Sequence, residues 1–93
     1  MPREITQDMV KNHRPLYVIA SEIRQHWSPV HVYAKPYVDA MRHVTTLRDS
    51  YGADTALSIV LYFLANAQRW HGAEARRIKA ELKQMCKDAG YKL

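Results

Sequence analysis

The sequence predicts an all-α fold, namely a compact four- or five-helix bundle-like single domain spanning residues 1–93. Apolar residues recur at the three- and four-residue spacing of helices, and the strict alternation of a half-buried strand is missing. The three glycines and four prolines fall between the apolar stripes, where helices begin and end. A chain of 93 residues is long enough to bury one modest core and too short for two domains.

The N-terminal part of the chain is predicted to contain two helices. Residues 1–14 form a short helix or a flexible arm, because Thr6 can cap a helix over residues 7–12. Pro15 suits the first turn of the next helix, since the N–H that proline lacks has no helical partner there. A Ser-Pro pair ends this helix after residue 27. Its apolar stripe comprises Leu16, Ile19, Ala20, Ile23 and Trp27.

The third predicted helix runs from Pro36 to Tyr51, with Gly52 as its stop. The preceding segment, residues 30–35, is compatible either with a loop or with a helical turn that Pro36 kinks. One face of the predicted helix carries the apolar or aromatic residues Tyr37, Ala40, Met41, Val44, Leu47 and Tyr51.

Two further helices are predicted in the second half of the chain. Asp54 is expected to cap a helix over residues 55–70. This helix is apolar nearly all round, so we expect other helices to surround it. The last helix runs over residues 73–88, with Gly90 as its stop. Its buried face is predicted to comprise Ala75, Ile78, Leu82, Met85 and Cys86.

The positive charge of the chain is concentrated near its C-terminal end. The formal net charge is +5, and residues 69–93 hold seven Lys/Arg against three Asp/Glu, whereas residues 1–68 hold seven against six. On a helical projection of residues 73–88, the basic and acidic side chains fall on opposite flanks of the apolar face. The basic flank comprises Arg76, Lys79, Lys83 and Lys87, and the acidic flank comprises Glu74, Glu81 and Asp88.

This separation of charge predicts an anionic partner, either nucleic acid or an acidic or nucleic-acid-binding protein. Like charges four residues apart on a helix each cost a few tenths of a kcal/mol, so a helix that served stability alone would interleave the signs. The basic stripe is about 16 Å long, which allows it to follow several phosphates. The alternative is a solvated face whose acids turn toward basic neighbours in the fold. The predicted partner-binding residues are Arg69, Arg76, Arg77, Lys79, Lys83 and Lys87.

Other function classes find little support in the sequence. The charged N-terminus does not resemble a signal peptide, and the longest apolar run, residues 59–65, is too short to span a bilayer. We therefore expect a cytoplasmic protein with no membrane contact. No Gly-rich phosphate loop or paired-carboxylate motif is present, and the five histidines form no HxxxH pair. The sequence accordingly predicts no enzyme, no metal site and no other cofactor.

Several single features have a functional and a structural interpretation. Asp39 and His43 are spaced for a general-base pair, although a surface ion pair is commoner. Cys86 falls on a buried flank, which favours a core residue over a nucleophile. Exposed aromatic residues such as Tyr33 and Tyr91 could stack on bases or anchor a protein interface, or they could be half-buried tyrosines with solvated hydroxyls.

A helix-turn-helix interpretation of the last two predicted helices is disfavoured. Gly72 between them is compatible with that motif. The preceding helix is long and apolar, however, and Ala73, Glu74 and Ala75 offer few groups that read base edges.

Three stretches in the second half of the chain stand out: Tyr51-Gly52-Ala53-Asp54, Ser58-Ile59-Val60-Leu61-Tyr62-Phe63-Leu64 and Trp70-His71-Gly72-Ala73-Glu74-Ala75-Arg76-Arg77-Ile78-Lys79. By these stretches the chain resembles small accessory proteins of tailed bacteriophages and prophages. The resemblance covers residues 51–85, and residues 16–27 and 36–41 show weaker similarity. It assigns no catalytic residues to this chain. It implies a phage-encoded binding protein in a bacterial host. Such a protein would sit on nucleic acid, act as a protein-only inhibitor of a host enzyme or a CRISPR-type defence complex, or serve as a structural virion or assembly component.

Overall fold

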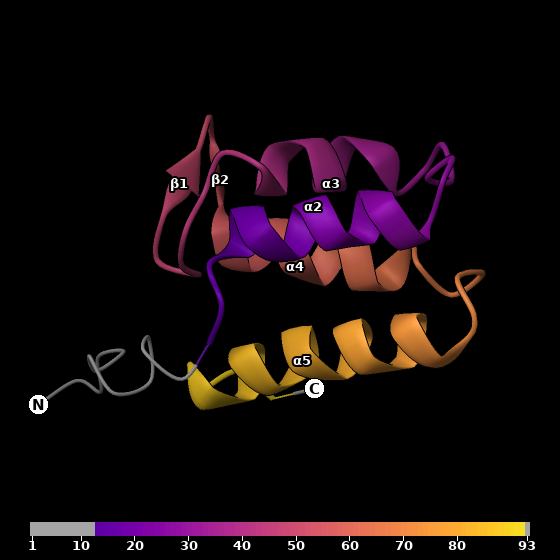
Figure 1. Ribbon diagram of the computed structural model, residues 1–93. Coiled ribbons are helices and arrows are strands. Elements are labelled where there is room, and N and C mark those ends of the chain that lie inside the picture. Colours follow the sequence, from indigo (N-terminus) through magenta and orange to yellow (C-terminus); the bar gives the residue numbers. More distant parts are fainter. Residues whose placement is uncertain (1–12, 93) are drawn as a thin grey trace, which may run out of the picture.

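In the computed structural model, which describes residues 13–92, the chain forms four helices and one short hairpin (Figure 1). The helix predicted over residues 7–12 lies outside the described residues. Consecutive helices run in opposite directions, as in an up-and-down bundle (Figure 1). The elements are α2 (Leu16–His26), α3 (Lys35–Met41), β1 (Ser50–Tyr51), β2 (Asp54–Thr55), α4 (Ala56–Ala65) and α5 (Ala73–Asp88).

The helices enclose one core. α3 and α5 each contact both α2 and α4, and they lie along opposite sides of that pair (Figure 1). α4, predicted to be the central helix, therefore shares the middle of the domain with α2. The apolar stripes predicted for α2 and α5 are confirmed as buried, apart from Trp27, which is half-buried. The largest fully buried side chains of the core are Phe63, Leu16, Ile19, Ile23, Met41, Ile78 and Leu82.

An aromatic cluster closes one end of the core. The indole rings of Trp27 and Trp70 stack with their centroids 5.3 Å apart and their planes 5° apart. Phe63 packs against each indole in a T-shaped arrangement, with both centroid separations at 6.4 Å. Such edge-to-face and stacked pairs add about 0.5–1.5 kcal/mol each to the stabilisation from burial. The cluster fixes the end of α2 and the segment after α4 to the same part of the core.

The prediction of a third helix as far as Tyr51 is wrong, because α3 ends at Met41. The Asp49 carboxylate accepts the backbone N–H groups of Thr45 and Thr46, at 2.7 and 3.0 Å. Such side-chain acceptors offer the backbone an alternative to helical hydrogen bonds. The chain between α3 and β1 therefore forms turns. Val44 and Leu47, at apolar positions of the predicted stripe, nevertheless remain buried.

A two-stranded antiparallel hairpin makes the domain mostly helical and not purely all-α. Ser50 pairs with Thr55, and Tyr51 with Asp54. Gly52, expected to stop a helix, instead lies in the tight turn between the strands with φ at +64°.

The hairpin leads directly into α4, and Thr55 caps this helix in place of the predicted Asp54. The Thr55 hydroxyl accepts the backbone N–H of Ser58 at 3.1 Å. At its other end α4 stops at Ala65, and Trp70 lies in the irregular connection to α5.

The segment before α3, whose course the sequence left open, forms a turn. The backbone N–H groups of Ala34 and Lys35 both donate to the carbonyl of His31, at 2.9 Å each. α3 begins at Lys35, so Pro36 lies in its first turn and does not kink a longer helix. None of the helices described in residues 13–92 is both long and apolar enough to cross a bilayer.

The Cys86 thiol is expected to resist modification in the folded protein. Its side chain is fully buried, and burial raises its pKa to about 11. At pH 8 only about one thiol in a thousand is then ionised, and the thiolate is the reactive form. We expect a chromogenic disulfide reagent to react with the thiol only after addition of denaturant. Rapid reaction of the native protein at pH 8 would contradict this placement.

Candidate functional site

The acidic flank of α5 lies toward α2, and its acids pair with His13 and Arg14, just before α2, and with Arg77 of α5 itself. Both carboxylate oxygens of Glu81 accept hydrogen bonds from Arg14, at 2.9 and 2.7 Å. Arg14 also donates to Glu22 on α2 at 2.8 Å. The hydrogen bond to Glu81, followed by that to Glu22, raises the pKa of Arg14 above its usual value. His13 lies 2.7 Å from the Asp88 carboxylate at the end of the same flank.

Arg77 belongs to this paired surface and not to the basic flank. Its guanidinium donates to Glu74 on α5 and to Glu22 on α2. The hydrogen bond from Arg77, together with that from Arg14, holds the pKa of Glu22 below its usual value. The structure therefore places Arg77, one of the predicted partner-binding residues, in an ion-pair network between two helices.

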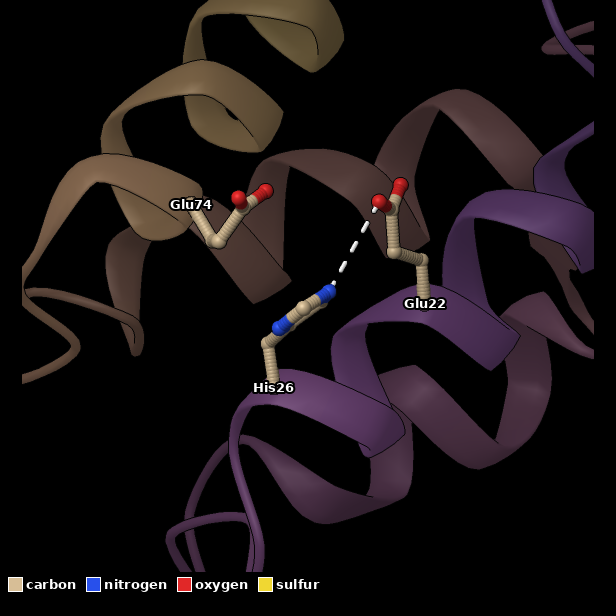
Figure 2. Close-up of side chains that lie close together, drawn as sticks. All are labelled: Glu22, His26 and Glu74. Atoms are coloured by element: carbon tan, nitrogen blue, oxygen red, sulfur yellow. Dashed lines mark ion pairs between the residues drawn. The ribbon is translucent and has the colours of Figure 1, made fainter.

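One group within this network has the side chains of a metal site. Figure 2 shows Glu22 and His26 on α2, with the carboxylate of Glu74 facing them from α5. The candidate ligand atoms all lie within 4.8 Å of one another, and His26 Nε2 is 3.8 Å from a Glu22 oxygen. Arg77 already donates to both carboxylates, so a cation would compete with its guanidinium. The residues form a salt-bridge network whose acids have a positive partner within the fold.

Sequence reasoning did not identify this group. Glu22 and His26 are spaced four residues apart, which is a signal that could have found the α2 half. The contribution of Glu74 depends on how α5 packs on α2, and spacing along the chain does not reveal it.

The basic side chains of α5, unlike the acidic ones, mostly remain without a charged partner in the described part of the chain. Arg76, Lys83 and Lys87 are exposed, and no Asp or Glu among residues 13–92 forms an ion pair with any of them. The net positive charge of this helix is therefore concentrated on one exposed edge.

Lys79 lies on the same flank but has a structural contact. Its ammonium donates to the backbone carbonyls of Ala67 and Trp70, at 2.9 and 2.7 Å. The side chain is partly buried, and desolvation, with a smaller contribution from Lys83, lowers its pKa. Lys79 thus fastens the segment after α4 to α5. That segment also carries Arg69, which is exposed.

A small hollow adjoins this segment. Its volume is about 170 Å³, and the exposed ring of Tyr33 forms part of its wall. The sequence had singled out Tyr33 and Arg69, but the two amide residues in the lining were missed because they carry no motif. The lining residues are His31, Tyr33, Ala65, Asn66, Gln68 and Arg69.

The remaining sequence candidates do not assemble into a site. Asp39 pairs with Lys35 at 2.8 Å, while the ring of His43 stacks on Tyr51, so Asp39 and His43 do not form the general-base pair. α4 and α5 run in opposite directions and are joined by residues 66–72, which is not the short turn of a helix-turn-helix (Figure 1).

Comparisons of the chain with models of known protein families, with curated proteins and with solved structures find no match.

Proposed function

We propose that this protein is a small, basic, non-enzymatic binding protein that engages nucleic acid through the basic edge of α5. We define the basic edge as Arg69, Arg76, Lys83 and Lys87. The observation that carries the proposal is the difference between the two flanks: the acids of α5 pair with His13, Arg14 and Arg77, and the described residues supply no acidic partner for the exposed basic side chains.

The charge arrangement favours an external anion over a purely solvated face. Lys83 and Lys87 are like charges one helical turn apart, an arrangement that lowers helix stability. A polyanion would relieve this repulsion, and each phosphate neutralised would release condensed counterions. The paired acids leave the positive field of the edge uncancelled on the outer side of the helix.

The setting that we propose is a bacterial cytoplasm, with the protein encoded by a phage. This part of the proposal rests on the resemblance of residues 51–85 to phage accessory proteins.

A second candidate function is a protein-only inhibitor of a nucleic-acid-handling host complex. A separate shallow hollow of about 560 Å³ favours it, because Tyr17 and Val18 are exposed there. Arg24 and Arg42 also line this hollow, and exposed aromatic and arginine side chains are typical of protein interfaces. Binding to a protein through this surface would not require the basic edge.

The proposed function is tested by titrating labelled duplex DNA, single-stranded DNA and RNA at several salt concentrations. Four phosphate contacts predict a log–log salt slope of about −3 to −4 on duplex. The variant R76Q/K83Q/K87Q should reduce affinity at least about tenfold at low salt and bring the slope to about −1, because one phosphate contact remains.

The matched control is R24Q/R42Q/R48Q, which removes the same charge from exposed positions outside α5. It should retain most of the affinity. Equal losses in the two variants would show that net charge alone governs binding. Absence of binding to every polyanion at low salt would overturn the proposed function.

A further inference from the structure

The hollow beside the basic edge combines an exposed aromatic ring with fixed polar groups. Tyr33 is 69% exposed, and its ring lies 5.3 Å from that of His31 between centroids. The Tyr33 backbone N–H donates to His31 Nδ1 at 3.3 Å, which assigns the proton of the neutral imidazole to Nε2. The turn before α3 therefore holds a stacking surface and a ring donor in a defined orientation.

The other wall of the hollow carries two amides and a guanidinium. Asn66 uses its Nδ2 to donate to the carbonyl of Tyr62 at 2.8 Å, which leaves its Oδ1 as an acceptor. Gln68 and Arg69 are exposed beside it. An aromatic face, an amide acceptor and planar donors are the groups that proteins use to stack an unpaired base and bond its edge.

Lys79 joins α5, which carries most of the basic edge, to the segment that lines the hollow. Its ammonium binds the carbonyls of Ala67 and Trp70, which flank Gln68 and Arg69 in the chain. A polynucleotide backbone that follows α5 toward its N-terminus therefore reaches the segment that lines the hollow.

An exposed tyrosine on α4 is close in the chain to the hollow residue Asn66. Tyr62 lies one helical turn before Asn66, and its ring contacts that of Tyr37 with centroids 5.5 Å apart. A charged track next to successive aromatic rings is the arrangement by which proteins hold single-stranded nucleic acid.

We infer that the hollow at Tyr33 is a base-binding site, and that the nucleic acid recognised by the basic edge is single-stranded. This inference rests on the proposed function and specifies its substrate. At about 170 Å³ the hollow is smaller than the ~300–1,000 Å³ of typical small-molecule pockets, so it suits one planar group. In a duplex the bases are stacked and paired, and their faces cannot reach Tyr33; an unpaired base can.

The inference is tested by comparing single strands with a duplex of the same length, using fluorescence anisotropy with the full chain. The single strand should bind at least about tenfold more tightly at equal salt. Tyr33→Ala should weaken single-strand binding by about 5- to 150-fold, the range that loss of one base–aromatic stack produces. Its salt slope should stay unchanged, because no phosphate contact is removed. Tyr33→Phe, which keeps the ring, should retain most of the affinity.

Tyr17→Ala serves as the matched control, since Tyr17 is also an exposed tyrosine but lies outside the hollow. It should bind the single strand like the unchanged protein. Equal affinity for single strand and duplex, or unchanged affinity of Tyr33→Ala, overturns the inference while the proposed function stands. Failure of every nucleic acid to bind overturns both. Thermal unfolding of Tyr33→Ala should match that of the unchanged protein, which separates loss of binding from loss of fold.

Discussion

Phe63→Ala is expected to lower the free energy of unfolding by about 3–5 kcal/mol, the range for truncating a buried phenylalanine. The Phe63 side chain is fully buried in α4. It packs in T-shaped contacts against both Trp27 and Trp70, so truncation removes one of the three rings of the aromatic cluster. A cavity in that position is not easily refilled, because the stacked indoles hold each other in place.

Urea unfolding followed by far-ultraviolet circular dichroism measures this loss. Tyr62→Ala is the matched control, because Tyr62 is the neighbouring residue on the same helix and is 51% exposed. The control should cost about 1 kcal/mol or less. If Phe63→Ala is too unstable to handle, Phe63→Leu keeps most of the volume and should give a smaller, measurable loss. Equal stability of Phe63→Ala and Tyr62→Ala would contradict the placement of Phe63 at the centre of the core.

Lys79→Met is expected to destabilise the protein by about 2 kcal/mol. The substitution keeps an unbranched apolar chain but removes the ammonium that donates to the carbonyls of Ala67 and Trp70. Hydrogen bonds from charged donors contribute about 1.5–3 kcal/mol, and acceptors left without a partner add a desolvation cost. The partly buried ammonium is itself desolvated, as the lowered pKa of Lys79 indicates. Its removal also removes this desolvation cost, so the net loss of stability is smaller than the loss of the hydrogen bonds alone.

Amide hydrogen exchange shows whether the loss is local. The backbone N–H of Trp70 donates to the Ala67 carbonyl at 3.1 Å, and its exchange should accelerate in Lys79→Met. Lys83→Met is the control, because Lys83 is one turn further along the same flank and exposed. It should leave both stability and exchange nearly unchanged. Unaltered exchange of Trp70 in Lys79→Met would show that the contact does not hold the segment.

The helical character of the domain could be predicted because apolar spacing records which side chains are buried. The same spacing predicted a third helix that is too long. Val44 and Leu47 are buried at the spacing of a helical face, although they lie in turns. The helical pattern already breaks at His43 and Val44, whose N–H groups donate to carbonyls three residues back, and the Asp49 carboxylate then binds the N–H groups of Thr45 and Thr46. Periodicity reports burial, and it does not distinguish a helix from a turn that buries the same residues.

The candidate site was predictable on one flank and less so on the other. Helical projection separated Arg76, Lys83 and Lys87 from the acids, and these three side chains are exposed. The projection could not show that Lys79 binds two carbonyls, or that Arg77 reaches Glu22 on another helix. Both contacts depend on tertiary neighbours. The hollow at Tyr33 was invisible for the same reason, because its two walls come from segments distant in the chain.

The stacked pair of indoles gives the protein a built-in optical reporter. Trp27 and Trp70 are the only two tryptophans in the chain, so its tryptophan emission originates from one spot. Trp70 is 4% exposed and lies next to Arg69, whose side chain lines the hollow. Quenching or a spectral shift on adding an oligonucleotide would therefore register events at that segment without any attached dye. Aromatic coupling between the parallel rings should likewise be visible in the circular dichroism spectrum and should vanish when the segment detaches.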